Sequence, residues 1–198
     1  MPKLGHLLNK IYHFLSHERL HTDDLIQLCL DGKQSAQIEI YNRYYKAMFN
    51  TALRIVKDSA EAEDVMQESF LSAFTKLHSF KGEVTFGSWL KRIVINNSIY
   101  HYRKQQKKNE VALDDIMYKV EDNDGVASDH VFTELKAQKV METMKRLKDN
   151  YRISLTLHLI EGYDYEEIST IMNISYANCR TTISRAKESL RKKMINAY

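Results

Sequence analysis

Apolar residues recur at intervals of three and four along most of the chain, and this spacing predicts amphipathic α-helices. In the first part of the chain the apolar rows predict four helices, over 22–32, 35–56, 59–77 and 86–107. After residue 130 they predict four more, over 131–147, over 152–159, and a short and a long helix between 165 and 190. The pattern therefore predicts an all-α chain with two helical parts.

Polar residues at the expected helix ends support these boundaries. Thr22 can cap the first helix, and Gly32 is the kind of residue at which a helix stops. Asp58 with Glu61 has the spacing of a capping box, in which each side chain bonds the other residue's backbone N–H. Residues 164–167 repeat that spacing. We therefore expect one helix to start at residue 59 and another at 165.

The composition excludes most other fold classes. The 198 residues include one Pro and six Gly, too few for the turns of a β-sandwich or β-barrel, and there is no glycine-rich phosphate loop. The apolar fraction of 43% argues against global disorder. Two cysteines cannot form a disulfide framework or a four-cysteine zinc site. Since the chain has no membrane-length apolar run and no signal peptide, we expect a soluble, cytoplasmic protein.

Charge lies in blocks of alternating sign, although 29 Lys and Arg nearly balance 26 Asp and Glu over the whole chain. A basic block over 91–108 precedes an acidic one over 110–134, and a second basic block follows residue 176. This arrangement is typical of two polyanion-binding modules and a linker, or of two solvated helix faces beside an acidic loop. We expect an N-terminal extension (1–21), two small helical domains (22–108 and 131–198) and an acidic linker (109–130).

The segment 165–190 predicts a helix-turn-helix, with a short capped helix, a turn at Asn173 and a longer helix. One stripe of the longer helix would face the core, namely Cys179, Ile183, Ala186 and Leu190. The opposite face carries side chains that suit base edges and phosphates: Asn178, Arg180, Thr181, Thr182, Ser184 and Arg185. This favours duplex DNA as a partner. The alternative is an ordinary helical hairpin with a solvated face.

Aromatic and basic residues are adjacent around the start of the 86–107 helix. Three rings occur within ten residues, at Phe80, Phe86 and Trp89. The helix then offers, near one face, Arg92, Asn96 and Arg103. Because aromatic rings stack on unpaired bases and cations follow phosphates, this segment suits single-stranded nucleic acid. Alternatively, Phe86 and Trp89 belong to the core.

Two short patterns resemble metal sites, and neither is complete. Residues 122–125 look like part of a calcium loop, but Val120 and Val131 stand where an EF-hand needs carboxylates. His13, His17 and His21 repeat every four residues, yet three ligands on one straight helix cannot all surround a metal. We therefore expect no metal and no cofactor, and a helical metalloenzyme is the weakest hypothesis.

Segments in a fixed order resemble the motifs of one bacterial family. Residues 62–70 resemble its polymerase-docking motif and residues 80–96 its promoter-melting and −10 segment. Residues 161–168 and 178–187 resemble its −35-binding helix-turn-helix. Their order and spacing are similar to those of the extracytoplasmic-function (ECF) sigma factors of the sigma-70 family. The resemblance implies a four-helix sigma region 2, a region 4 helix-turn-helix, and a role that is not enzymatic.

The resemblance also implies roles for individual residues. The clamp helices of the polymerase largest subunit would contact Asp64, Gln67 and Glu68. The −10 strand would contact Phe80, Lys81, Phe86, Trp89, Arg92, Asn96 and Arg103. The −35 groove would contact Asn178, Arg180, Thr181, Ser184, Arg185 and Lys187.

The implied partners are core RNA polymerase, through its clamp helices and flap, promoter DNA, and an anti-sigma factor of the kind that is often tethered to a membrane. No small-molecule substrate is implied. A second hypothesis is a stand-alone helix-turn-helix regulator that binds duplex DNA as a dimer, although such a protein needs no melting loop. The chain departs from the family pattern at Lys148, where Pro is usual, at Tyr176-Ala177 in the turn, and at Thr182, where Arg is common.

Overall fold

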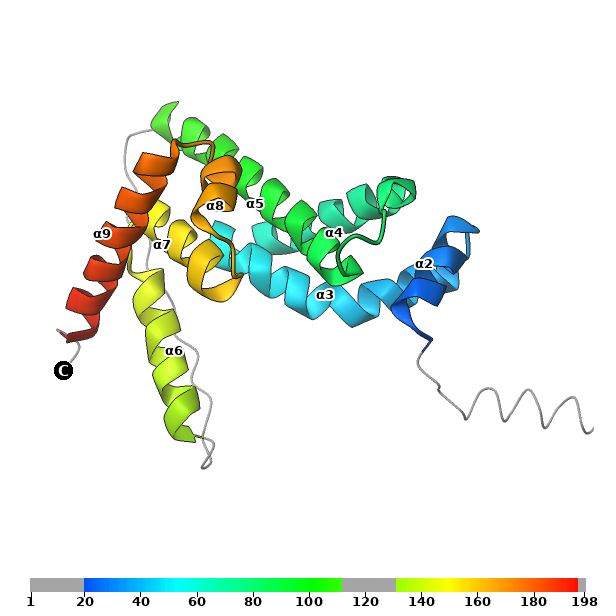
Figure 1. Ribbon diagram of the computed structural model, residues 1–198, viewed down its shortest axis with the longest axis horizontal. Helices are drawn as coiled ribbons and strands as arrows, with labels where there is room; N and C mark the ends of the chain where they lie inside the picture. The colour runs from blue at the N-terminus through cyan, green and yellow to red at the C-terminus, as the bar shows by residue number, and fades with distance from the viewer. Residues whose placement is uncertain (1–19, 112–130, 196–198) are drawn as a thin grey trace, which may run out of the picture.

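The computed structural model describes residues 20–111 and 131–195, and these residues form helices and no strand (Figure 1). The first part contains α2 (Thr22–Leu30), α3 (Gln34–Val56), α4 (Ser59–Thr75), the 3-10 turn η1 (Leu77–Ser79) and α5 (Phe86–Val111). The second contains α6 (Val131–Lys145), α7 (Asp149–Leu155), the π-helical turn η2 (Thr156–Ile160), α8 (Tyr165–Met172) and α9 (Tyr176–Ile195). The prediction of an all-α chain is confirmed.

The first group of helices is built on α3, α4 and α5, which pack against one another, with α2 at one end of α3 (Figure 1). Most of the predicted apolar residues supply its core, because they face the other two helices, but Ile38 and Tyr45 of the row predicted for α3 are exposed. Among its most deeply buried side chains are Ile40, Ile55, Val65, Met66, Leu90 and Val94. The packing places the polar faces of α4 and α5 at the surface.

The second group is built on α9, which α6, α7 and α8 contact. Its interior holds Leu155, Leu157, Ile168 and Ile183. All four residues of the predicted stripe on α9 are buried, so that prediction is confirmed. The helix predicted over 152–159 is two elements, since α7 starts at Asp149 and gives way to the π-helical turn at Thr156.

The predicted helix starts are confirmed at 59 and 165, but their caps differ. Asp164 accepts from the Glu167 N–H at 2.8 Å, and the Glu167 carboxylate accepts from the Asp164 N–H at 3.0 Å, which completes a capping box. At the start of α4, Asp58 accepts from the Glu61 N–H at 2.9 Å, but the Glu61 side chain accepts from Gln105 on α5 instead. The capping box of Asp58 and Glu61 is therefore only half formed, because the Glu61 side chain bonds a residue of the neighbouring helix instead of the backbone.

The ends of the shorter helices depend on backbone conformation. Thr22 is the first residue of α2 and makes no cap, so its predicted role is wrong; its hydroxyl lies 3.4 Å from that of Tyr44. Gly32 follows α2 with φ at +78°, as expected for a helix stop. Asn173 adopts the left-handed conformation, with φ at +47°, in the turn between α8 and α9. That prediction is confirmed.

The two groups of helices lie against each other. Helix α7 contacts α3, and the segment from η2 to α8 runs beside α3 and α5 (Figure 1). No local pattern in the sequence predicts this arrangement, because the residues that make the contacts are between 47 and 110 positions apart in the chain.

Candidate nucleic-acid and polymerase-binding surfaces

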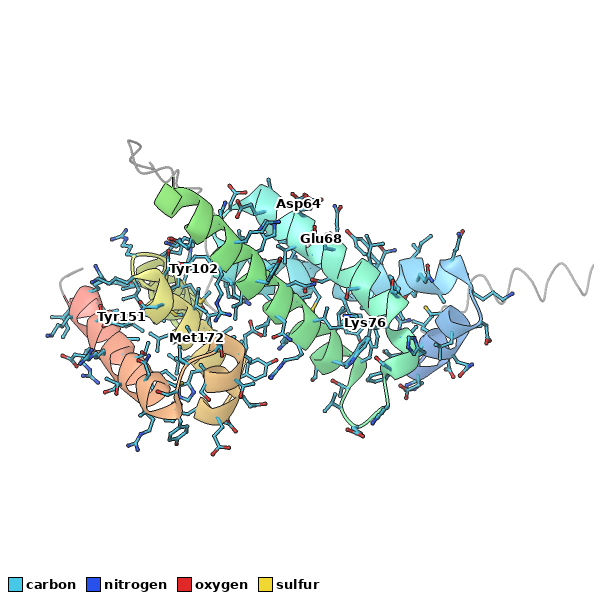
Figure 2. All side chains as sticks on the ribbon, turned by 90° about the horizontal axis from the view of Figure 1, so that it is seen from above. Asp64, Glu68, Lys76, Tyr102, Tyr151 and Met172 are labelled. Atoms are coloured by element: carbon cyan, nitrogen blue, oxygen red, sulfur yellow. The ribbon has the colours of Figure 1, made fainter. Side chains whose placement is uncertain are left out.

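An acidic face lies on the outside of α4. Asp64, Gln67 and Glu68 are exposed, while Val65 and Met66 between them are buried, which fixes the direction in which the polar side chains point. Figure 2 shows Asp64 and Glu68 on the side of the molecule away from α8 and α9. The surface formed by Asp64, Gln67 and Glu68, here called the acidic α4 face, is open to a basic partner.

The acidic α4 face has an exposed apolar neighbour, Leu71, which no sequence motif had indicated. Leu71 is 68% exposed and stands four residues after Gln67 and three after Glu68, so it extends the same side of the helix. Its exposure follows from this place on the outer side of α4, since residues three and four positions apart share one face of a helix.

The three predicted rings form one cluster. The ring centres of Phe80 and Phe86 are 5.7 Å apart, those of Phe80 and Trp89 are 5.4 Å apart, and those of Phe86 and Trp89 are 5.7 Å apart. Phe86 is only 3% exposed and packs on Tyr44, whereas Phe80 and Trp89 are half-buried. The burial of Phe86 favours the alternative that its ring belongs to the core, and its contact with DNA stays a prediction. In this structure Phe86 supports the other two rings.

The loop beside this cluster presents Lys81 to solvent and turns at Gly82, whose φ is +73°. The loop ends at Thr85, whose hydroxyl oxygen accepts from the Ser88 N–H at 3.2 Å and so caps α5. A side chain at residue 82 would find open space but an unfavourable backbone conformation. The turn at Gly82 and the cap at Thr85 thus fix the course of the loop, and the half-buried Phe80 and Trp89 lie at its two ends.

The basic face of α5 is divided between solvent and the second group of helices. Asn96 is exposed. The guanidinium carbon of Arg92 lies 5.2 Å from the ring centre of Tyr163, and its Nη1 lies 3.9 Å from a Glu167 oxygen. Arg103 donates to the backbone carbonyl of Met172. Both arginines expected to contact the −10 strand therefore contact α8 and the segment before it.

Glu161 is at the centre of the contact between the two groups. Its carboxylate is 3% exposed and accepts from Arg54 at 3.1 Å and from Thr51 at 3.4 Å through one oxygen. Its other oxygen lies 3.1 Å from the Lys91 ammonium. Two cations and a hydroxyl therefore compensate the cost of burying this charge. No local pattern in the sequence distinguishes Glu161 from a surface glutamate, so its role is visible only in the folded chain.

Beside Glu161, burial raises the pKa of the Tyr163 hydroxyl, and the Glu161 carboxylate adds to that rise, whereas Arg92 and Lys91 oppose it. The tyrosine therefore stays neutral and offers its ring to Arg92. Arg92 is thus paired with the neutral Tyr163 ring, and Lys91 beside it is paired with the buried Glu161 carboxylate.

Arg152 makes a second set of contacts between the groups. It is 3% exposed and donates to the backbone carbonyls of Arg54 and Ile55, the latter at 3.0 Å, at the end of α3. It also donates to Asp149 at 3.1 Å, and the Lys57 ammonium lies 2.7 Å from the same carboxylate. A helix end normally leaves its last carbonyls without partners inside the helix, so Arg152 satisfies groups that would otherwise need water.

Tyr102, which is labelled on α5 in Figure 2, completes this second set: its hydroxyl donates to Asp149 at 3.0 Å. Burial, together with the Asp149 carboxylate, raises the pKa of Tyr102 to about 12. Burial also acts to raise the pKa of Asp149, but Lys57 and Arg152 outweigh it and hold that pKa below its ordinary value of 3.8.

We expect acid to loosen the contact between the two groups. Since the folded-state pKa of Asp149 is depressed, its contribution is complete above about pH 4 and is lost as the pH falls through the lower folded value. Small-angle X-ray scattering from about pH 7 to about pH 3 should show an expansion of the chain. In Asp149→Asn the Asp149-dependent part of that response should be missing, whereas an identical response in both proteins would assign it to other carboxylates.

The candidate DNA-reading face of α9 is open. Its exposed side chains are Asn178, Arg180, Thr181, Ser184 and Arg185, and Lys187 is half-buried. A shallow hollow of about 580 Å³ runs over this face and is lined by Tyr165, Ala177, Arg180, Thr181, Ser184 and Arg185. Ser175 accepts from the Asn178 N–H at 3.2 Å and caps the helix, which aims the first turns of α9 outward.

In the part of the chain that the structure describes, we find neither a metal-binding cluster nor a membrane-spanning helix. Within residues 20–111 and 131–195 no group of three or more His, Cys, Asp or Glu side chains could hold a metal ion. His13, His17 and the calcium-like pattern at 122–125 lie outside the described residues. Of the helices described, none is long and apolar enough to cross a bilayer.

Comparisons with known proteins match both groups of helices. The family model of Sigma-70 region 2 matches residues 40–108, and that of Sigma-70 region 4 matches residues 137–190. The ECF RNA polymerase sigma factor SigM of Bacillus subtilis is 34% identical over 153 residues, which cover 77% of this chain and 91% of that one. The RNA polymerase sigma-H factor of Pseudomonas aeruginosa is 29% identical over 179 residues, covering 85% and 91%.

A solved structure shares the fold. The sigma factor RpoE of Bartonella quintana, crystallised in complex with the anti-sigma factor NepR, has a TM-score of 0.58 and 20% sequence identity. The match covers 83% of this chain and 96% of that one. The fold and the order of the two groups of helices are thus common to the two proteins.

Proposed function

The chain belongs to the ECF sigma factors of the sigma-70 family, and from this premise we propose that it directs core RNA polymerase to promoters and helps to open them. The observation that carries the proposal is that both family matches fall on helices with open, chemically suitable faces. These are the acidic face of α4 and the cationic face of α9. The region boundaries 22–108 and 131–198 are part of the proposal.

The acidic α4 face is our candidate for docking on the polymerase. Asp64 and Glu68 supply charge toward a basic partner and Gln67 supplies hydrogen bonds. The exposed Leu71 beside them would add an apolar contact, which is the kind of group that interface centres favour. The partner surface would be the clamp helices of the largest subunit, with the flap engaging region 4.

The loop and the start of α5 are our candidate for the −10 strand. Phe80 and Trp89 expose part of their rings beside Lys81, so a base could stack on them while the cation follows the phosphates. Asn96 is exposed on the next turns of the helix. Arg92 and Arg103 would join this surface after leaving their contacts with α8.

The open face of α9 is our candidate for the −35 element. Arg180 and Arg185 suit phosphates and guanine edges, and the short polar side chains between them suit other base edges. These short polar residues are Asn178, Thr181 and Ser184. Lys187 would contact the DNA backbone. The family assignment spans both groups of helices, so the stand-alone regulator is not favoured.

The wider setting follows from the same premise. The protein would act in the cytoplasm as an initiation factor, with the bond-forming chemistry left to the polymerase and no cofactor of its own. An anti-sigma factor is the regulatory partner we propose, because the related RpoE was crystallised with one. The test is binding to core RNA polymerase, followed by transcription from a library of genomic fragments. Binding to duplex DNA without binding to core polymerase would contradict the proposal.

For Arg185→Ala we expect roughly a threefold to tenfold weaker binding to duplex promoter DNA, because one phosphate contact is lost. The slope of log affinity against log salt should fall by about 0.9. Fluorescence anisotropy over a salt series measures both quantities. Lys192→Ala, further along α9, is the matched control and should leave the slope as it is. A slope unchanged in both variants would remove Arg185 from the DNA contact.

A further inference from the structure

The contact between the two groups of helices uses the residues that the −10 strand would need. Arg92 lies over Tyr163 and near Glu167, and Arg103 donates to the Met172 carbonyl. Lys91, adjacent to Arg92, is paired with the buried Glu161. Three cations of α5 are thus paired with the segment from η2 to α8, which lies alongside α5 in Figure 1.

The chemistry of this contact resembles that of a bound phosphate. Glu161 presents two carboxylate oxygens to a guanidinium, an ammonium and a hydroxyl, which is the donor set that holds a backbone phosphate. The carboxylate is attached to the chain and is therefore present at a high effective concentration. A DNA phosphate that is to pair with Lys91 of α5 has to displace it.

Other functional faces are unaffected by this contact. The acidic α4 face is on the outside of the first group, and the polar face of α9 is exposed. The closed arrangement consequently leaves the candidate polymerase and −35 surfaces free while it occupies part of the −10 surface. This selectivity distinguishes the contact from general packing between two domains.

We propose that Glu161 is an intramolecular latch, which holds the second group of helices against α5 and keeps Lys91, Arg92 and Arg103 from single-stranded DNA until it is released. The inference rests on the proposed function, since it takes α5 as the −10 surface. Arg152, with Asp149 and Lys57, is a second fastening between the same two groups. Release of the latch exposes the cations without any change inside either group.

The direct test compares Glu161→Gln with Glu166→Gln in the full chain. Both substitutions remove one negative charge, but Glu166 is an exposed glutamate on α8. Scattering should show a larger radius of gyration for Glu161→Gln alone. A fluorescein-labelled thymidine 20-mer, used because its bases are unpaired, should bind about fivefold or more tightly to Glu161→Gln and less than twofold more tightly to Glu166→Gln.

The variant Lys57→Asn distinguishes the latch from a general effect of net charge on DNA binding. Lys57 is an exposed residue with a positive φ of +72°, and Asn occurs at positive φ more often than other non-glycine residues do, so Asn is the substitution that disturbs this backbone least. It removes a positive charge, and attraction to DNA by net charge alone predicts weaker binding of the 20-mer. The latch predicts the opposite, namely tighter binding and a larger radius, because the fastening at Asp149 is weakened.

Three results would overturn the inference. The first is a wild-type radius for both Glu161→Gln and Lys57→Asn, with circular dichroism showing that both are folded. The second is 20-mer binding by Lys57→Asn that is weaker than wild type. The third is an enlarged radius in Glu161→Gln without tighter 20-mer binding. Adding Arg92→Ala to Glu161→Gln then shows which proposal fails. If the double variant binds the 20-mer more weakly than Glu161→Gln, only the latch is refuted. If binding is unchanged, the assignment of α5 as the −10 surface is refuted as well.

Discussion

Combining Asp64→Lys with Glu68→Lys is expected to lower the affinity for core RNA polymerase by about 100-fold or more. The two carboxylates are exposed one turn apart on α4, so their reversal places two cations opposite a basic partner surface. The helix should persist, since Val65 and Met66 on its inner side remain buried and unchanged. Competition with a labelled sigma factor for core polymerase measures the loss.

A matched double variant separates position from net charge. Asp31→Lys with Glu142→Lys changes the net charge by the same amount but lies outside α4. It should bind core polymerase within about twofold of wild type. An equal loss in both double variants would show that net charge, rather than the acidic α4 face, governs the association. In that case α4 would be an ordinary solvated helix.

For Trp89→Ala we expect promoter opening to fall by roughly 10- to 100-fold, while the closed complex weakens much less. One stacked base contributes about 1–3 kcal/mol, and Trp89 together with Phe80 forms the exposed part of the aromatic cluster. On the proposed function, the closed complex depends on α4 and α9, which the substitution does not touch. Fluorescence of 2-aminopurine in the −10 region reports opening, and gel mobility on duplex promoter reports the closed complex.

Trp89→Phe is the control for this prediction, because it keeps a ring in contact with Phe80 and Phe86. Opening should recover to within about fivefold of wild type if stacking is the function of the side chain. Equal losses of opening and of closed binding in Trp89→Ala would instead indicate that Trp89 only fills the core. Thermal unfolding of both variants, with and without DNA, checks that the cluster stays folded.

Local features of the sequence anticipated much of the second group. The stripe of α9 is buried as its spacing requires, and Asn173 makes the left-handed turn. The box of Asp164 and Glu167 forms as expected. In the turn and the capping box the interacting groups are at most four residues apart, and successive residues of the stripe are three or four apart, so the geometry of a single helix or turn places them.

Local patterns were an incomplete guide where distant residues decide the surroundings of a side chain. Glu61 has the spacing of a capping residue but turns to Gln105, which lies 44 positions later. Phe86 stands among DNA-suited rings but is covered by Tyr44 and its neighbours. Ile38 and Tyr45 belong to the apolar row predicted for α3 but are exposed. Such outcomes depend on how the helices pack, which no window of neighbouring residues contains.

The sequence by itself determined the helices, the face of each that turns inward, and the residue types available on the outer faces, because periodicity and capping act within a few residues. Only the tertiary structure decided which outer faces stay open. It left the acidic α4 face and the polar face of α9 exposed, and it paired Arg92 and Arg103 with α8. It also buried Glu161 between Arg54 and Lys91. These partners are far apart in the chain, and a charge is buried only where folding brings its counterions to it.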